Sequence, residues 1–175
     1  MQTSSTTHTD PGKDDQMVFL RVDLGKQVIE LHRDQAVLHN YPVSTALNGA
    51  GELSGSGCTP RGKHRVKIKV GAGEPENAVF VGRRTTGEIY SDELAAQYPE
   101  RDWILTRIIW LTGSESGRNL GGNVDTLRRY IYIHGCPDTE PMGIPRSHGC
   151  IRMRNRDIMA LFDMVENGMP VEILE

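Results

Sequence analysis

Cys150 lies in the segment IPRSHGCIRMRN, where His148 precedes it by two residues and Arg152 follows it by two. A cysteine reacts as a nucleophile in its thiolate form, and positive charge or a nearby helix N-terminus stabilises that form. The sequence predicts a helix that begins just beyond Arg152. We therefore expect these surroundings to lower the pKa of Cys150 and to make its sulfur a nucleophile.

A cysteine nucleophile needs an imidazole within hydrogen-bond reach and a third group that holds the imidazole in place. His134 is the last residue but one of the segment RRYIYIHG, and positions 134 and 150 are 16 apart, which leaves a loop long enough to bring the chain back. The carbonyl group of Gly135 can orient the imidazole ring. The backbone N–H groups of Gly149 and Cys150 can form an oxyanion hole, and a glycine at 149 lets the backbone approach a substrate carbonyl closely.

Three other readings of Cys150 stay open at this point. A free cysteine often packs in a core as a small apolar side chain. The pairs His134-x-Cys136 and His148-x-Cys150 supply two nitrogens and two sulfurs for zinc, although one intervening residue is tight for two ligands of one ion. A transient Cys136–Cys150 bridge is the third reading, since three cysteines, with Cys58, are too few for a disulfide framework.

Most of the segments that must position these residues are short and alternate polar with apolar residues, which is typical of half-buried β-strands. A turn at Gly25 and a hairpin turn at His32–Gln35 divide the first strands. The later strands are expected at His64–Val70, AVFVGR, Trp103–Gly113, Arg128–Gly135 and PVEIL. The alternation places Tyr130, Tyr132 and His134 on one face of the Arg128–Gly135 strand, with Tyr130 expected to pack in the core.

One late helix is predicted in RNRDIMALFDMVENG, with Asn155 as N-cap and Gly168 at the C′ position. The long connection from Gly71 to Asp102 contains SDELAAQ, a short helix candidate capped by Ser91. A connection of this length within a compact domain is often a lid or binding loop. The expected domain is residues 17–175, preceded by a flexible polar tail of residues 1–16.

The composition fits one folded domain: the chain has 175 residues, 37% of them hydrophobic, and a net charge of −3. Nucleic-acid binders normally carry a basic face, so we expect no nucleic-acid partner. The sequence contains no apolar run of about 20 residues, so we expect no membrane insertion. If Cys150 is a nucleophile, we expect neither a metal nor a cofactor. The sequence does not reveal the oligomeric state.

Two segments closely resemble the L,D-transpeptidases with a YkuD-type catalytic domain. HGCPDTEPMGIPRSHGCIRM is similar to the signature of this family, and CTPRGKHRV is similar to an upstream stretch of it. The resemblance spans roughly Met17 to Leu174. It implies a mostly β fold, a YkuD-like β-sandwich with one late α-helix and an inserted lid segment.

The resemblance also implies a reaction. Such enzymes use cysteine to attack the bond between diaminopimelate and D-alanine in a peptidoglycan tetrapeptide stem, and they pass the acyl group to an amine. With water as acceptor the outcome is L,D-carboxypeptidase activity. A non-catalytic wall-binding domain and a zinc-binding domain remain the alternatives. The expected partner is the stem peptide, and the expected location is the cell envelope (periplasm), although the sequence shows no export signal and the cytoplasm stays open.

By the same resemblance Cys150 is the nucleophile and His134 the base, oriented by Gly135. His148 stays a rival base, because residues two apart along an extended loop point the same way, and His148 and Cys150 have this spacing. His148 and Gly149 shape the oxyanion site. Three further residues are assigned to the loop or to substrate binding: Ser147, Arg152 and Tyr132. One departure stands out, since position 136 is a cysteine where many relatives have threonine.

Overall fold

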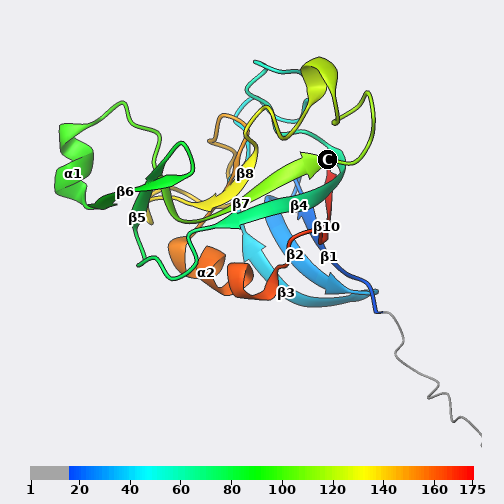
Figure 1. Cartoon of the computed structure of the whole chain (residues 1–175), viewed down its shortest axis with the longest axis horizontal. Coiled ribbons are helices and arrows are strands. Elements are labelled where there is room, and N and C mark those ends of the chain that lie inside the picture. Colours follow the sequence, from blue (N-terminus) through cyan, green and yellow to red (C-terminus); the bar gives the residue numbers. More distant parts are fainter. Residues whose placement is uncertain (1–15) are drawn as a thin grey trace, which may run out of the picture.

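The computed structural model of the chain describes residues 16–175 and confirms the predicted mostly β class (Figure 1). The predicted tail, residues 1–16, lies outside the described residues except for its last position. The strands are β1 Val18–Asp23, β2 Val28–Arg33, β3 Ala36–Pro42, β4 Gly62–Val70, β5 Ala78–Val81, β6 Arg84–Ile89, β7 Ile104–Gly113, β8 Tyr132–Gly135, β9 Ile151–Met153 and β10 Pro170–Leu174. The helices are α1 Asp92–Gln97, the 3₁₀ turn η1 Gly122–Val124 and α2 Asn155–Met164.

All the strands of the described part belong to one curved sheet. Its order is β3-β2-β1-β10-β4-β7-β5-β6, and β8 pairs with β7 while β9 pairs with β8. The segment that follows β3 returns to β9, because the backbones of Ser44 and Arg152 exchange two hydrogen bonds of 2.9 Å. The two halves of the sheet therefore enclose a common core, which agrees with the sandwich-like arrangement implied by the resemblance.

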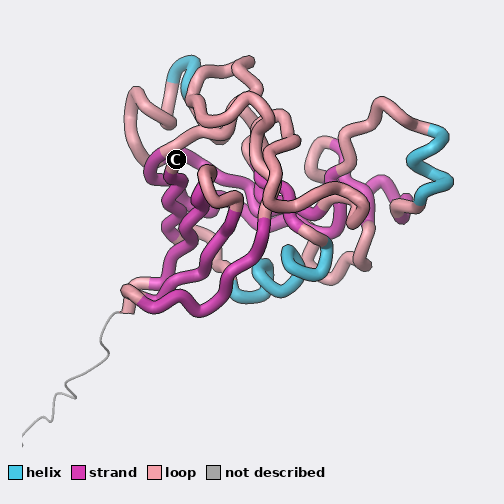
Figure 2. Tube along the Cα trace, turned by 180° about the vertical axis from the view of Figure 1, so that it is seen from behind, coloured by secondary structure: helices cyan, strands magenta, loops and turns pink. Residues whose placement is uncertain are grey.

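The core forms between the β1–β2–β10 region, the β7–β8–β9 region and helix α2. Alternate residues of β7, β8 and β9 face this core, namely Ile109, Leu111, Ile133, Ile151 and Met153. From α2 the apolar stripe of Ile158, Leu161 and Phe162 fills the same cluster, as predicted for an amphipathic helix. Figure 2 shows α2 lying beside the strands rather than in the projecting part of the chain.

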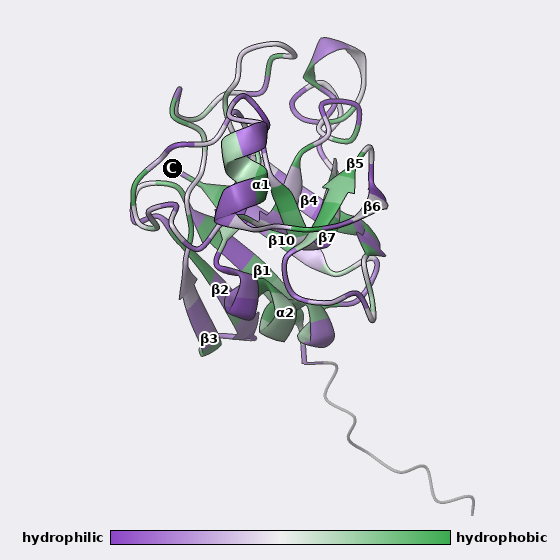
Figure 3. Cartoon of the chain, turned by 90° about the vertical axis from the view of Figure 1, so that its left-hand side faces the viewer, coloured by the Kyte–Doolittle hydropathy of each residue, from purple (hydrophilic) through white to green (hydrophobic). Residues whose placement is uncertain are grey.

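The predicted lid segment is the part that projects from the body of the sheet in Figure 1, with β5, β6 and α1 in sequence. Ser91 caps α1 as predicted, since its side chain accepts a hydrogen bond of 3.1 Å from the Leu94 N–H. The projection is anchored by apolar contacts: Trp103 packs with Tyr90 and Leu94. Figure 3 shows β5 and β7 as largely apolar, which agrees with their pairing inside the sheet.

Two local predictions were wrong. Residues 128–130 form a turn, and the strand begins only at Tyr132, because Tyr130 adopts a left-handed backbone with φ of 55° that breaks the alternation. The Tyr130 side chain is 53% exposed rather than packed in the core. In the late helix, Arg154 is the N-cap and Asn155 is the first helical residue, while the helix ends at Met164, well before Gly168. The Asn155 amide is fully buried and serves another purpose, described below.

Within the described residues, no helix is long and apolar enough to cross a membrane.

Candidate active site

The register of β8 and β9 brings four side chains of interest to one face of the sheet. The two strands are parallel, and His134 is the partner of Arg152. Because side chains alternate along a strand, Tyr132 shares the face of His134, and Cys150, two residues before Arg152, lies on that face too. This site face is opposite to the face that carries Ile133 and Ile151 into the core. The register thus places the thiol and the imidazole on the same side of the sheet, while their direct contact stays a prediction.

The Cys150 thiol is enclosed by the backbone of the neighbouring strand. Its sulfur accepts from the Tyr132 N–H at 3.4 Å and its S–H donates to the Tyr130 carbonyl at 3.3 Å. The side chain also packs against an apolar cluster that includes Ile108 and Tyr132. Burial raises the pKa of Cys150 to about 11, and the Tyr132 N–H only partly opposes this.

The predicted lowering of the Cys150 pKa was therefore wrong. The helix that was expected to stabilise a thiolate starts at Asn155, and strand β9 separates it from the sulfur. Arg152 does lower the pKa of the thiol, but its effect is smaller than that of burial. The resting group is a neutral thiol, so its proton must be removed during the reaction.

His134 is the candidate base on the site face. It is 1% exposed, and its Nδ1–H donates to the Gly135 carbonyl at 2.6 Å, as predicted for the orienting group. A carbonyl only accepts, so the neutral ring carries its proton on Nδ1 and leaves Nε2 as the base. Burial lowers the pKa of His134, while the Gly135 hydrogen bond and the Asp102 charge act against that shift.

Gly135 is required for packing as well as for its carbonyl. A Cβ at this position would lie 2.6 Å from the Asn155 Oδ1 and 2.6 Å from the Leu105 carbonyl oxygen. The Asn155 amide that occupies this space donates to the carbonyl of Cys136 at 2.9 Å and also contacts Thr106. Asn155 thus fixes the end of β8 behind the imidazole, a role that its predicted position as a helix cap did not suggest.

The loop before Cys150 is held by its own side chains. Ser147 is buried; its hydroxyl donates to the Cys150 carbonyl and accepts from the Gly149 N–H at 3.3 Å. Thr59 donates to the Gly149 carbonyl at 2.9 Å, which joins the CTPRG segment to the SHGC segment. Gly149 has φ of 134° and a Cβ there would lie 3.2 Å from the Cys58 carbonyl oxygen. Both quoted motifs therefore build one loop around Cys150.

His148 lies apart from this arrangement. Its side chain is 81% exposed, and its Nδ1 lies 3.9 Å from the Asp102 carboxylate. The structure therefore gives no contact that would support His148 as the base. The oxyanion roles expected of His148 and Gly149 stay predictions, since the Gly149 N–H is directed at Ser147.

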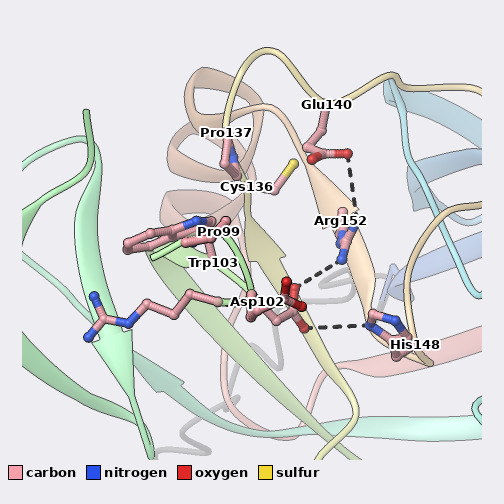
Figure 4. Close-up of a pocket in the computed structure, with 10 residues that line it drawn as sticks. Pro99, Asp102, Trp103, Cys136, Pro137, Glu140, His148 and Arg152 are labelled. Atoms are coloured by element: carbon pink, nitrogen blue, oxygen red, sulfur yellow. Dashed lines mark hydrogen bonds and ion pairs between the residues drawn. The ribbon is translucent and has the colours of Figure 1, made fainter. Parts of the chain in front are cut away.

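Arg152 joins two acidic residues beside a cavity of about 230 Å³. Its guanidinium pairs with Asp102 at 2.9 Å and with Glu140 at 3.8 Å, and only 8% of the residue is exposed (Figure 4). The cavity is lined by residues 99–103, Cys136, Pro137, Glu140, His148 and Arg152. Because Arg152 is the strand partner of His134, the cavity lies next to the imidazole, and its Asp102 comes from the end of the lid segment.

Two arginines near the thiol were missed by sequence reasoning. Arg129 donates to the carbonyls of Gly51, Glu52 and Cys58 at 2.6 to 3.1 Å. Arg83 donates to the Tyr132 hydroxyl at 3.1 Å. Each contact joins segments far apart in the sequence, so no local pattern pointed to them.

The three cysteines are unpaired in the structure, with Cys136 buried beside the end of β8. Among residues 16–175, no group of three or more His, Cys, Asp or Glu side chains is arranged to hold a metal ion. The two His-x-Cys pairs are thus not brought together into such a group.

Comparison with known proteins places this geometry in context. The model of the L,D-transpeptidase catalytic domain (YkuD) matches residues 18–173. A curated relative, YkuD of Bacillus licheniformis, is 41% identical over 46 residues, which cover 26% of this chain and 28% of the relative.

Two solved structures share the fold. An L,D-transpeptidase from Mycobacterium smegmatis has a TM-score of 0.54 at 20% identity, over 91% of this chain and 59% of that one. L,D-transpeptidase 3 from Mycobacterium tuberculosis, in complex with a faropenem-derived adduct, has a TM-score of 0.55 at 17% identity, over 91% and 61%. This chain thus spans about six-tenths of the length of the two solved chains.

Proposed function

The chain belongs to the L,D-transpeptidase catalytic domain family, and from this membership we propose that it is a cysteine-dependent peptidoglycan L,D-transpeptidase. Its substrate is a tetrapeptide stem, and the bond attacked is that between diaminopimelate and the terminal D-alanine. Cys150 forms the acyl-enzyme and an amine takes the acyl group. Because the stem lies outside the cytoplasmic membrane, the protein acts in the cell envelope.

One observation carries the proposal: His134 on β8 and Cys150, which directly precedes β9, lie on the same face of this pair of parallel strands. The imidazole Nδ1–H is committed to Gly135, so Nε2 is the nitrogen that exchanges protons. The same face also carries Tyr132 and Arg152. Acyl transfer by a thiol requires a base near the sulfur, and this placement supports His134 in that role.

The reaction proceeds in balanced steps. His134 Nε2 takes the S–H proton while the sulfur of Cys150 bonds to the diaminopimelate carbonyl carbon, and the carbonyl oxygen becomes an oxyanion. The oxyanion collapses, the C–N bond breaks, and the imidazolium gives its proton to the departing D-alanine nitrogen. An acceptor amine then attacks the thioester and loses its proton to Nε2, and the sulfur leaves and recovers that proton.

Burial fits this order of events. With a thiol pKa near 11 and an imidazole pKa lowered by burial, both groups are neutral at pH 7. A neutral pair transfers its proton as the S–C bond forms, so the charge appears only in the transition state, where nearby backbone dipoles stabilise it. The S–H must first turn from the Tyr130 carbonyl toward Nε2.

The test uses purified disaccharide-tetrapeptide, with the products followed by mass. We expect release of D-alanine together with a cross-linked dimer, and no release by Cys150→Ala. Tripeptide alone would indicate water as the acceptor, and hence an L,D-carboxypeptidase. Muropeptide binding without turnover would reject the enzymatic proposal in favour of a wall-binding domain.

A second readout depends only on the nucleophile. The M. tuberculosis relative was solved with a faropenem-derived adduct, so faropenem is a suitable probe for this chain. We expect one covalent adduct per chain, absent in Cys150→Ala and present in Cys58→Ala. An adduct that persists in Cys150→Ala would show that another residue is the nucleophile.

A further inference from the structure

The positive groups near Cys150 differ in whether their hydrogen-bond donors are occupied. Arg152 is paired with Asp102 and Glu140. Arg129 directs its guanidinium at the carbonyls of Gly51, Glu52 and Cys58 and at the Ser56 hydroxyl. Both cations are thus used to hold the fold together around the thiol.

Arg83 is the exception. Within residues 16–175, no carboxylate pairs with it, and the hydrogen bond that its side chain makes is to the Tyr132 hydroxyl, at 3.1 Å. A guanidinium has five N–H donors arranged as a rigid fork, so most of the donors of Arg83 have no protein partner. The residue is partly exposed, which leaves these donors accessible to a ligand.

The guanidinium is nevertheless held in one place. Its central carbon lies 4.6 Å from the centroid of the Trp110 ring and 5.1 Å from that of Tyr130. Arg83 itself has φ of 64° in the turn between β5 and β6, a conformation unusual for a residue other than glycine. The strained turn and the two rings together fix an arginine that would otherwise be mobile, which lowers the entropy cost of binding through it.

This fixed cation is connected to the nucleophile through the two tyrosines of the 130–132 segment. The ring of Tyr132 bears the hydroxyl that Arg83 binds, and the backbone N–H of the same residue contacts the Cys150 sulfur at 3.4 Å. The Tyr130 ring lies under the guanidinium, and the Tyr130 carbonyl accepts from the thiol. Trp110 packs against both tyrosine rings, and Trp110 and Cys150 border the same apolar cluster. Arg83 is therefore placed on the same side of the sheet as the thiol, one tyrosine side chain away from it.

The ligand that matches such a group is a carboxylate, whose two oxygens fit the guanidinium fork. A tetrapeptide stem carries two carboxylates close to the scissile bond, one on the side chain of diaminopimelate and one at the end of D-alanine. We propose that Arg83 binds a carboxylate of the stem next to the scissile bond and selects acidic stems over amidated ones. The proposal rests on the proposed function above and assigns a specificity-determining residue to the lid segment.

The alternative is that Arg83 only fastens the β5–β6 hairpin to the aromatic rings of the sheet. A fastening role would affect every substrate to the same extent, because it changes the closure of the lid and not the recognition of charge. Carboxylate binding would instead change the preference between substrates. The ratio of kcat/KM values for charged and amidated stems therefore separates the two roles.

The experiment compares three tetrapeptide stems: one with both carboxylates free, one amidated at the diaminopimelate side chain, and one amidated at the D-alanine terminus. We expect the wild-type protein to prefer the free stem over one of the amidated stems by about ten- to a hundredfold in kcat/KM. The amide that causes the loss identifies the carboxylate that Arg83 binds. We expect Arg83→Gln to reduce that preference to less than about threefold and Arg83→Lys to keep part of it.

Arg84→Gln is the matched control, because Arg84 is the exposed residue that directly follows Arg83, at the start of β6. We expect it to keep both the activity and the preference of the wild-type protein. Arg83→Gln with an unchanged preference, or a wild-type protein that uses all three stems equally well, would overturn the assignment of Arg83 and leave the transpeptidase proposal standing. A wild-type protein that releases D-alanine from none of the stems would instead reject the proposed function.

Discussion

The S–H of Cys150 donates to the carbonyl oxygen of Tyr130 across 3.3 Å, so the sulfur at the centre of the site rests as a neutral thiol. Tyr130 makes this contact because its left-handed backbone turns the chain just before β8 begins. A carbonyl accepts a hydrogen bond but repels a thiolate, and burial acts in the same direction. The chemistry at Cys150 therefore depends on proton removal by His134 and not on a thiolate formed in advance.

The first prediction concerns the pH dependence of acylation. His134 must be neutral to act as a base, and burial lowers its pKa, so activity should persist below the ordinary histidine value of about 6.5. The thiol pKa is about 11, so the alkaline limit should lie well above pH 9. The rate of D-alanine release, measured from pH 4 to 10, should show a broad plateau. A fall in rate between pH 7 and 9 would indicate a thiolate–imidazolium pair and contradict the neutral pair.

The second prediction distinguishes the roles of the two histidines that precede the nucleophile in the sequence, His134 and His148. His134→Gln should lower kcat by about 10²- to 10⁴-fold, because the general base is lost. His148→Gln should stay within a few-fold of wild type, since the His148 side chain is 81% exposed and paired only with Asp102. Single-turnover acylation by faropenem provides the measurement. Equal losses in the two variants would return His148 to the role of base.

The third prediction tests the close packing behind the imidazole. Gly135→Ala should lower both the thermal stability and the activity, because the new Cβ would meet Asn155 and the Leu105 carbonyl at 2.6 Å. Gly25→Ala is the matched control, since a Cβ there has its closest neighbour at 3.4 Å and the backbone has no positive φ. Melting temperatures and D-alanine release measure the two effects. A Gly135→Ala protein as stable and active as the Gly25→Ala protein would contradict this packing.

Local sequence patterns predicted much of the sheet. Alternation predicted β4, apolar runs predicted β7 and β10, and the separation of His134 from Cys150 allowed the return of the chain. The placement of the two residues on one face depends on a parallel register between β8 and a strand of three residues, β9, which was too short to be predicted as a strand. The predicted lowering of the Cys150 pKa was wrong for the same reason, because β9 separates the helix from the sulfur.

The contacts of the lid segment could not be predicted from local sequence patterns. Arg83 and Asp102 lie 19 positions apart, at residues 83 and 102, and bind residues on β8 and β9 through contacts that span about 50 positions. Neither residue lies in a motif. The sequence predicted a lid from the length of this connection and from the resemblance. Only the packing of β5 onto Ile108 and Tyr132 shows which side of the sheet the lid covers.

The fourth prediction concerns Asp102, a positioning residue. Its charge raises the pKa of His134 against the larger effect of burial, and its carboxylate pairs with Arg152 at 2.9 Å. Asp102→Asn removes the negative charge that raises the pKa of His134, and it leaves the positive charge of Arg152 without this partner. The pKa of His134 should therefore fall further. The acid limb of the pH–rate profile should then move to lower pH. A limb that stays in place while kcat falls uniformly would show that Asp102 acts only through structure.

The fifth prediction links a buried histidine outside the site to the stability of the fold. His64 lies on β4 and is 1% exposed, with its ring nitrogens bonded to the Gly62 carbonyl at 3.0 Å and the Thr126 hydroxyl at 2.9 Å. Burial lowers the pKa of His64 to about 4, whereas the unfolded chain takes up the proton near 6.5. The unfolded state therefore binds more protons between these values, and the free energy of unfolding falls as the pH decreases from 6.5 to 4.

This contribution amounts to roughly 3 kcal/mol when complete. His64→Gln removes the titrating group, so the free energy of unfolding of the variant should depend less steeply on pH in that window than that of the wild-type protein. Urea unfolding at pH 7, 5.5 and 4.5 measures the two slopes, and the comparison is valid even if the variant is less stable at every pH. Parallel slopes would mean that His64 titrates alike in the folded and unfolded states, which the two hydrogen bonds and the dry surroundings of the ring oppose.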